Sequence, residues 1–210
     1  MPKAILFDFD GPLADSLNPH IDFLLRMSSI YGGPSTLPKA EDTEVWKNLS
    51  GYPMTRFMEN VGFTKEQAKQ IFSNEYDAEF ANHPSPLYIG VPKLINGLKN
   101  RGFILGIISL NLRVNILASL GNITDVFRVI HSADEFAEKT SALTDACQIL
   151  QIKPVEAVYI GDAPKDYEAA HAVGMPFIGV AYGWQITGRE KEYISARNPA
   201  ELESMLAFLD

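Results

Sequence analysis

The sequence predicts an α/β fold with a parallel sheet and one inserted helical region. From residue 91 onward, apolar runs alternate with helical patterns, and this alternation is typical of parallel strands joined by right-handed crossovers. The runs that we expect to form strands are 103–108, 126–130, 157–160 and 176–180. Residues 17–85, in contrast, carry helical patterns and no convincing strand. We therefore predict an α/β domain made of residues 1–16 and 86–210, interrupted by a helical domain at 17–85.

The first expected strand, residues 4–7, is a continuous apolar run, as in a parallel strand that is covered on both faces. Asp8 and Asp10 follow it directly, and Gly11 and Pro12 end the strand. Two carboxylates this close raise each other's pKa unless a positive charge lies between them. A divalent cation such as Mg²⁺, which prefers oxygen ligands, meets that need. The alternative is that both aspartates are turn residues at the end of a strand.

Helical spacing in the inserted region predicts several helices before a linker. Thr64 and Gln67 form a capping-box pattern. It precedes a longer helix that extends to about residue 81. Two prolines within residues 82–86 indicate the linker, since neither fits a helix interior or a central strand. The other helices that we expect here are 21–31, 43–49 and 53–61.

Helices in the α/β domain are expected between and after its strands. Glycines close several of them, as is common at helix C-termini. The predicted ranges are 92–100, 114–120, 141–150, 167–173 and 199–209.

Composition narrows the class of protein. The chain has 210 residues and a net charge of −8, which argues against a nucleic-acid-binding surface. A single cysteine, Cys147, allows no internal disulfide, and this fits a reducing compartment. We find neither a signal-peptide pattern nor an apolar run of membrane-spanning length. We expect a soluble, cytoplasmic protein without a membrane or nucleic-acid partner, and its oligomeric state stays unknown.

Polar residues follow the expected strands at their carboxyl ends, where open α/β sheets bind ligands. Ser109 follows 103–108, Lys139 follows the strand near residue 129, and Asp162 and Asp166 follow 157–160. Together with the first two aspartates they form a set suited to phosphoryl transfer. One carboxylate can act as nucleophile, a second as general acid and base, and an acidic pair can hold Mg²⁺.

Each of the later residues also has a purely structural interpretation. Asp166 could be an N-cap for the helix that follows it, and Ser109 could be a plain turn residue. A single lysine is usually a solvated surface residue, so Lys139 is the least specific of the set, and Lys165 is a rival for the same role.

These stretches resemble the haloacid dehalogenase superfamily of aspartate-nucleophile phosphohydrolases, and in particular its phosphoglycolate-phosphatase-like branch. The resemblance rests on residues 8–16 (Asp-Phe-Asp-Gly-Pro-Leu-Ala-Asp-Ser), on the strand into Ser109, on Lys139 and on residues 161–166 (Gly-Asp-Ala-Pro-Lys-Asp). It implies a Rossmann-like, doubly wound sheet with residues 17–85 as an α-helical cap domain. It also implies a Mg²⁺-dependent phosphatase that acts on a small phosphorylated metabolite.

The same resemblance implies roles for individual residues. Asp8 would be the nucleophile and Asp10 the general acid and base. The Mg²⁺ ligands would be Asp8, the backbone carbonyl of Asp10, and Asp162, with Asp166 as a partner behind them. The substrate phosphate would be bound by Ser109, Leu110 and Lys139.

Three positions depart from the family's usual pattern: Pro12 replaces Thr or Val, Leu110 replaces a small polar residue, and Thr140 replaces Pro. Asn111 could take over from Leu110. These departures keep open a phospho-ligand-binding module with weak or no catalysis. A phosphomutase of the β-phosphoglucomutase type is the other alternative. That activity is disfavoured because Gly51 is followed by Tyr-Pro-Met, without the expected arginine.

Overall fold

The computed structural model describes residues 2–184 and 192–207. The chain divides into two compact units. One consists of Met1–Asp15 with Pro86–Asp210 and contains the sheet, and the other is Ser16–Ser85. Nowhere in the described ranges is a helix both long and apolar enough to cross a bilayer.

The described residues of the first unit form a six-stranded sheet in which all paired strands are parallel. The strand order is β3-β2-β1-β4-β5-β6, and the direction of winding reverses between β1 and β4. This confirms the predicted doubly wound α/β fold, which places a ligand site at the carboxyl ends of those two strands. The strands are β1 (Ala4–Phe7), β2 (Ile104–Ile108), β3 (Val129–His131), β4 (Ala157–Gly161), β5 (Phe177–Val180) and β6 (Ser195–Ala196).

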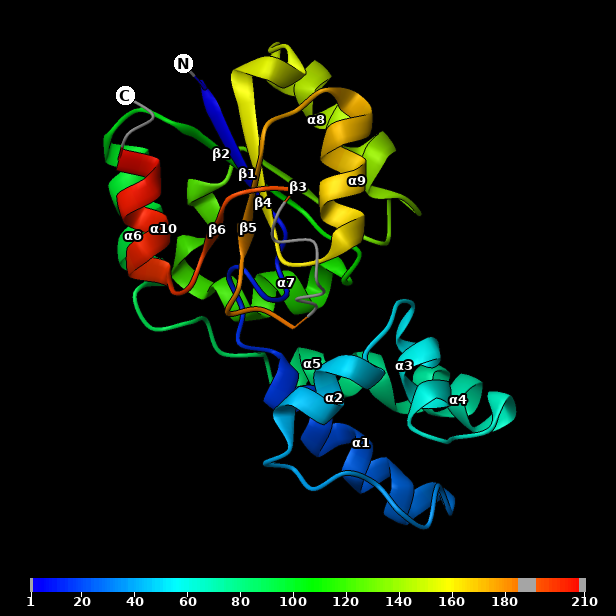
Figure 1. The fold of residues 1–210 in the computed structure, drawn as a ribbon. Helices are drawn as coiled ribbons and strands as arrows, with labels where there is room; N and C mark the ends of the chain where they lie inside the picture. The colour runs from blue at the N-terminus through cyan, green and yellow to red at the C-terminus, as the bar shows by residue number, and fades with distance from the viewer. Residues whose placement is uncertain (1, 185–191, 208–210) are drawn as a thin grey trace. The chain divides into compact units, whose positions relative to one another are not determined.

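Helices cover both faces of this sheet. Figure 1 shows α6 and α10 on one face and α8 and α9 on the other. The helices of this unit are α6 (Val91–Asn100), α7 (Arg113–Leu120), α8 (Lys139–Leu150), α9 (Pro164–Val173) and α10 (Pro199–Ala207). Two 3₁₀ helices, Gly121–Val126 and Pro154–Glu156, complete the connections.

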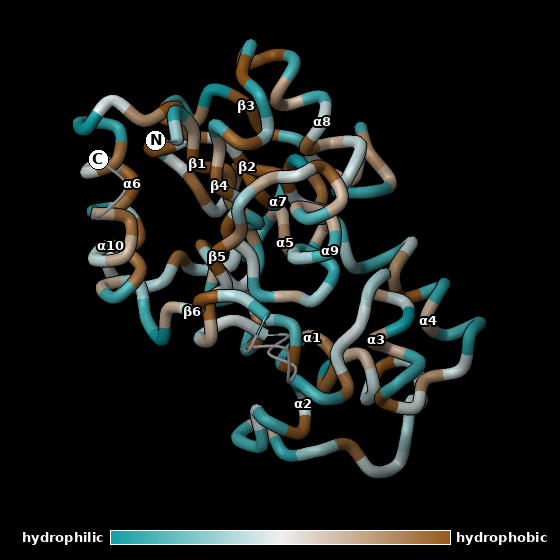
Figure 2. Tube along the Cα trace, turned by 45° about the horizontal axis from the view of Figure 1, so that its top comes forward, coloured by the Kyte–Doolittle hydropathy of each residue, from teal (hydrophilic) through white to brown (hydrophobic). Residues whose placement is uncertain are grey.

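Strand β1 shows why the sheet is buried on both faces. Successive side chains of a strand point to opposite faces. Ile5 and Phe7 accordingly join the core beneath α6 and α10, and Ala4 and Leu6 join the core beneath α8 and α9. All four are fully buried. An uninterrupted apolar run is therefore the pattern that this position requires, and the central strands are mostly brown in the hydropathy colouring of Figure 2.

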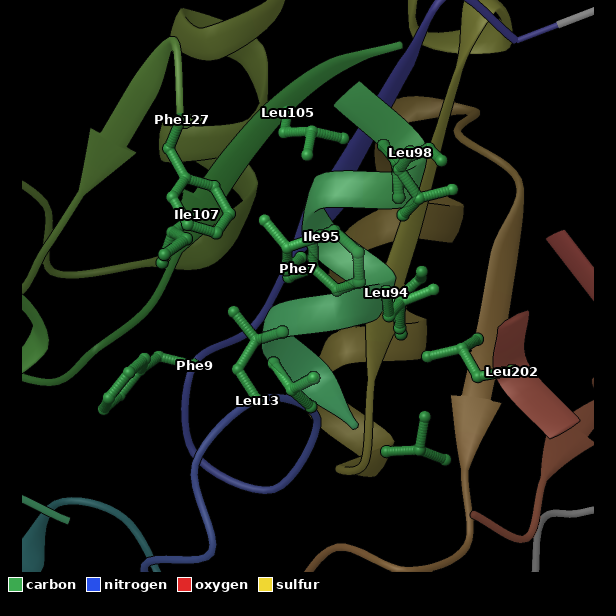
Figure 3. Close-up of a cluster of buried hydrophobic side chains, with 14 of the residues drawn as sticks. Phe7, Phe9, Leu13, Leu94, Ile95, Leu98, Leu105, Ile107, Phe127 and Leu202 are labelled. Atoms are coloured by element: carbon green, nitrogen blue, oxygen red, sulfur yellow. The ribbon is translucent and has the colours of Figure 1, made fainter. Parts of the chain in front are cut away.

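Helix α6 supplies much of the first core layer. Its Leu94 and Ile95 are buried, and so is Leu98 one helical turn later; all three face Phe7 and Leu105 of the sheet (Figure 3). Each such fully buried side chain contributes about 1.5–3 kcal/mol of transfer free energy. These side chains pack α6 against β1 and β2 in one continuous apolar core.

The Ser16–Ser85 unit contains helices and no strand among its described residues. The predicted capping box is present at the start of α4: Gln67 N–H donates to Thr64 Oγ1, and Thr64 N–H donates to Gln67 Oε1. Trp46 and Phe57 are fully buried and pack edge to face. The helices are α1 (Leu17–Tyr31), α2 (Thr43–Leu49), α3 (Met54–Asn60), α4 (Lys65–Ile71), a π-helical segment (Phe72–Tyr76) and α5 (Asp77–Asn82).

Several element boundaries differ from the sequence-based expectation. Strand β3 begins at Val129 rather than at residue 126, because the preceding residues are wound into a 3₁₀ helix. Helix α8 begins at Lys139 and α9 at Pro164, each earlier than expected. Strand β6 was not predicted, since two residues are too few to form a recognisable pattern. The expected last helix extends to 209, and its end lies outside the described residues.

Candidate active site

Three buried carboxylates meet at the carboxyl ends of β1 and β4. Asp8, Asp162 and Asp166 each offer an oxygen atom within 4.8 Å of the others. The pairing of β1 with β4 explains two of them, because Phe7 lies opposite Ile160 and both strands end beside each other. Asp166 comes from the first turn of α9. The structure thus brings together three of the residues expected at the site.

Lys139 is the cation of this cluster. Its Nζ lies 2.6 Å from Asp8 Oδ2 and also donates to Asp166 Oδ1. The lysine is the first residue of α8, so the helix start, rather than a flexible loop, directs its side chain. Lys165 is exposed at the surface. Of these two lysines, the one that contacts Asp8 is therefore Lys139.

Asp166 has its acceptor capacity filled by protein donors. Oδ2 accepts the backbone N–H groups of Asp162 at 3.2 Å and Ala163 at 3.0 Å. Oδ1 accepts from Lys139 and lies 3.3 Å from the Tyr159 hydroxyl. A carboxylate offers about four lone-pair sites. Asp166 therefore both caps the start of α9 and orients Lys139, which is the position expected of a residue behind the metal ligands.

Burial and mutual repulsion dominate the electrostatics of the cluster. Burial raises the pKa of the Asp8 carboxyl to about 7, although Lys139 acts in the opposite direction. Burial also raises the pKa of Asp162 well above its usual range, and the neighbouring Asp166 and Asp8 add to this. For Lys139, burial would lower the pKa, but Asp166 and Asp8 raise it. One ammonium cannot balance three ionised carboxylates, and the raised pKa values of Asp8 and Asp162 reflect that imbalance.

The donor set fits a divalent cation. Asp8 and Asp162 offer the hard oxygen ligands that such ions prefer, and Asp166 lies within 4.8 Å of both. A divalent ion would also compensate the charge that Lys139 leaves unbalanced and so favour the ionised carboxylates. The cluster is thus consistent with the divalent metal site that the sequence predicted.

Backbone groups hold Asp162 in place. Trp184 N–H donates to Asp162 Oδ2 at 2.5 Å. A Cβ atom at Gly11 or at Gly183 would collide with the Asp162 carboxylate, so both positions require glycine for close approach. Gly11 also has a φ of +94°, a conformation that L side chains rarely adopt. Sequence reasoning missed Gly183 and Trp184, because they lie about twenty residues from Asp162 with no motif to connect them.

Asp10 has a different environment from Asp8. Its side chain is partly exposed, and its Oδ2 accepts a hydrogen bond from Asn111 Nδ2 at 2.8 Å. Asn111 N–H donates in turn to Ser109 Oγ at 3.2 Å, at the end of β2. Leu110 lies between them and is partly buried. Asn111, which sequence reasoning offered as a substitute for Leu110, therefore contacts the second carboxylate of the first motif.

Two tyrosines brace the loop after Asp10. The Tyr182 hydroxyl donates to the backbone carbonyl of Pro12 at 3.0 Å, and the Tyr88 hydroxyl donates to the carbonyl of Tyr182 at 3.0 Å. Their rings pack edge to face. Sequence reasoning missed both residues. Since Pro12 has no N–H but keeps its carbonyl, this contact fixes the loop without the missing donor.

A family model described as haloacid dehalogenase-like hydrolase matches residues 5–180. The matched region includes all of the carboxylates, the lysine and the serine described above.

Relatives of similar length share about a quarter of their residues with the chain. A phosphoglycolate phosphatase from Synechococcus elongatus is 27% identical over 185 residues, covering 87% of this chain and 85% of the relative. An N-acetylmuramic acid 6-phosphate phosphatase from Pseudomonas aeruginosa is also 27% identical, over 193 residues, covering 87% and 83%.

Solved structures share the fold. A haloacid dehalogenase-like hydrolase from Streptococcus pneumoniae superposes with a TM-score of 0.82 at 23% identity, and the match covers 100% of this chain and 99% of that one. The predicted resemblance to the phosphoglycolate-phosphatase-like branch is confirmed by these matches. The chain belongs to the haloacid dehalogenase-like hydrolases.

Proposed function

We propose that the protein is a Mg²⁺-dependent phosphatase that hydrolyses a small phosphomonoester through an aspartyl-phosphate on Asp8. One observation carries this proposal: a buried carboxylate, Asp8, is paired with Lys139 and lies within 4.8 Å of two further carboxylates. A fourth, Asp10, stands two residues away in a partly exposed position. The family and the phosphatase relatives support the same reaction class.

In the first step the ionised Asp8 carboxylate attacks phosphorus. The bond between phosphorus and the ester oxygen breaks, and its electron pair stays on that oxygen. Asp10 donates a proton to it, so the alcohol leaves neutral. Lys139 favours the ionised, nucleophilic form of Asp8 because its ammonium lies 2.6 Å from Oδ2.

In the second step Asp10, now ionised, takes a proton from water. The water oxygen attacks phosphorus, the bond to Asp8 breaks, and inorganic phosphate is released with the Asp8 carboxylate restored. Ser109, Leu110 and Lys139 bind the phosphoryl oxygens through hydroxyl, backbone and ammonium groups. The Asp10 proton is regained in each cycle, so no further reactant is needed.

The metal would be held by Asp8, Asp162 and the backbone carbonyl of Asp10, with Asp166 orienting Lys139 and the Asp162 backbone. Bound Mg²⁺ supplies positive charge to the phosphate oxygens. Gly11 and Gly183 leave room for the Asp162 carboxylate, and the Trp184 N–H that donates to it helps to orient this proposed ligand.

Substrate choice is assigned to the Ser16–Ser85 unit, acting as a cap domain that excludes water. The two relatives named above are equally similar to the chain, yet one is named for a two-carbon acid and the other for an amino-sugar acid. The substrate class that they support is a small phosphomonoester, phosphoglycolate included.

The test is phosphate release from 2-phosphoglycolate, N-acetylmuramic acid 6-phosphate and p-nitrophenyl phosphate, each with Mg²⁺ and with EDTA. Wild type is expected to turn over at least one ester, and only with Mg²⁺. Asp8→Asn is expected to lose at least roughly 1,000-fold, because removing one member of a catalytic unit forfeits most of its rate enhancement.

The matched control is Asp125→Asn, the same substitution at an exposed position of the same unit. Its activity should equal that of wild type. Full activity in Asp8→Asn would refute the covalent mechanism. Interconversion of phosphate isomers without net phosphate release would show a phosphomutase instead.

A further inference from the structure

Asn111 has an amide orientation that its neighbours determine. Its Oδ1 lies 2.7 Å from the backbone nitrogen of Leu112 and 3.1 Å from Asn115 Nδ2. A backbone N–H can only donate, so the atom that faces it must be the amide oxygen. The other end of the same amide is therefore the NH₂ group, and it faces Asp10 Oδ2 at 2.8 Å. Asn111 donates to Asp10 whatever the charge of that carboxyl.

Asn115 strengthens this orientation at a cost to the fold. It is 3% exposed in the first turn of α7, among residues of the apolar core. Its Nδ2 donates to Asn111, while its own Oδ1 has no partner among the described residues. A buried amide with an unsatisfied oxygen is destabilising. The side-chain hydrogen bond that Asn115 makes is the one that it donates to Asn111 Oδ1.

We propose that Asn111, backed by Asn115, is a positioning residue for the proton-transferring carboxyl of Asp10. The relay runs from Asn115 Nδ2 to Asn111 Oδ1 and from Asn111 Nδ2 to Asp10 Oδ2. It fixes the rotation of the Asp10 carboxyl, whose remaining oxygen is then directed to the ester oxygen or to the attacking water. This inference rests on the proposed phosphatase function and assigns a residue that the function does not by itself require.

A neutral amide suits this task better than a cation. Asp10 must be protonated to release the alcohol and ionised to activate water. An ammonium at hydrogen-bond distance would strongly favour the ionised form. An amide N–H orients the carboxyl in both states, and therefore allows one residue to serve both steps.

Esters with different leaving groups can distinguish positioning of Asp10 from other roles of Asn111. p-Nitrophenolate is a stable anion and leaves without a proton, whereas an alkoxide needs one. With Asp10 misplaced, the first step stays fast for p-nitrophenyl phosphate, and hydrolysis of the aspartyl-phosphate slows for every ester. The prediction is a burst of about one p-nitrophenol per active site followed by slow turnover.

The experiment compares Asn111→Ala with wild type on 2-phosphoglycolate and on p-nitrophenyl phosphate, in steady state and by rapid mixing. We expect kcat to fall by roughly 10- to 100-fold on both esters, a part of the 10²- to 10⁴-fold that general acid–base catalysis supplies. For p-nitrophenyl phosphate KM should fall together with kcat, because the aspartyl-phosphate accumulates when its hydrolysis limits turnover, and kcat/KM should stay near the wild-type value. The burst should appear only in the variant. Asn115→Ala should show the same pattern more weakly.

Asn111→Asp covers the case in which the alanine variant fails to fold. It keeps the oxygen that accepts from Leu112 and Asn115 and replaces only the NH₂ group. The control is Asn96→Ala, an exposed asparagine of α6 that donates to a helix carbonyl, and it should match wild type.

The outcomes are distinct. A burst on p-nitrophenyl phosphate, with kcat and KM lowered together, in either Asn111 variant supports positioning. A raised KM without a burst would mean that Asn111 binds phosphate, and wild-type kinetics would mean that it has no role; both overturn the inference while leaving the phosphatase intact. An inactive wild type would instead refute the proposed function, and the inference with it.

Discussion

The two aspartates of the first motif stand two residues apart and are held by opposite means. Asp8 is buried, paired with the ammonium of Lys139 and surrounded by other carboxylates. Asp10 is partly exposed and bound by the neutral amide of Asn111. Charge compensation by Lys139 stabilises Asp8, whereas a hydrogen bond from the Asn111 amide orients Asp10.

This difference matches the work that each carboxylate is proposed to do. A nucleophile must stay ionised, and a buried cation is the strongest way to favour that form. A group that gives and takes a proton must exist in both states, so a permanent charge beside it would hinder one of them. The chain thus pairs Asp8 with a cation and gives Asp10 a hydrogen bond from a neutral amide.

The largest effect on stability is expected for Lys139→Met. The change removes the cation from three buried carboxylates, and an uncompensated buried charge costs about 3–5 kcal/mol. The free energy of unfolding, measured by urea denaturation in EDTA, should fall by that amount. If the ion pairs of Lys139 contribute no more than a surface ion pair, the loss will stay below about 1 kcal/mol.

Lys165→Met is the matched control for this measurement. The same substitution at an exposed position of α9 should change the free energy of unfolding by less than about 0.5 kcal/mol. Equal losses in the two variants would contradict the assignment of Lys139 as the compensating cation.

The next effect is stabilisation by Mg²⁺. The excess negative charge of Asp8, Asp162 and Asp166 should bind the ion in the folded state and not in the unfolded chain. At 100 times its dissociation constant the ion adds about 2.7 kcal/mol, or roughly 5–10 °C in Tm for a chain of this size. Thermal unfolding with Mg²⁺ and with EDTA measures the shift.

Asp162→Asn should abolish most of that Mg²⁺-dependent shift while leaving the fold intact. Asp125→Asn, at an exposed site, should retain it in full. A shift of equal size in both variants would place the bound ion elsewhere on the molecule.

The smallest effect is expected for Tyr159→Phe, which removes one hydroxyl oxygen beside Asp166. The hydroxyl lies 2.9 Å from the Ile108 carbonyl and 3.3 Å from Asp166 Oδ1. Its loss should reduce the free energy of unfolding by about 1–2 kcal/mol, since one buried acceptor loses its donor. Urea denaturation of the variant tests this value.

Tyr31→Phe is a useful comparison, because that hydroxyl donates to Glu75 at a more exposed position. It should cost less than about 1 kcal/mol. If Tyr31→Phe lost more free energy of unfolding than Tyr159→Phe, the buried Tyr159 hydroxyl would not stabilise the cluster of Asp8, Lys139 and Asp166.

Local pattern was sufficient for most of the fold. The apolar runs of β1, β2 and β4 and the glycine-closed helices are local signals, and they also place Asp8, Ser109 and Asp162 at the ends of strands. The capping box of α4 was equally local. The starts of α8 and α9 could not be predicted from local pattern, because Lys139 and Pro164 carry no apolar periodicity.

The amino-acid sequence by itself determined which carboxylates end strands, because the position and burial of each strand follow from short-range periodicity. Only the tertiary structure decided which partners those carboxylates have. The contacts of Lys139 with Asp8, of Asn111 with Asp10 and of Trp184 with Asp162 join residues 131, 101 and 22 positions apart. Such contacts depend on side-chain direction across neighbouring strands and helix ends, which no local pattern encodes.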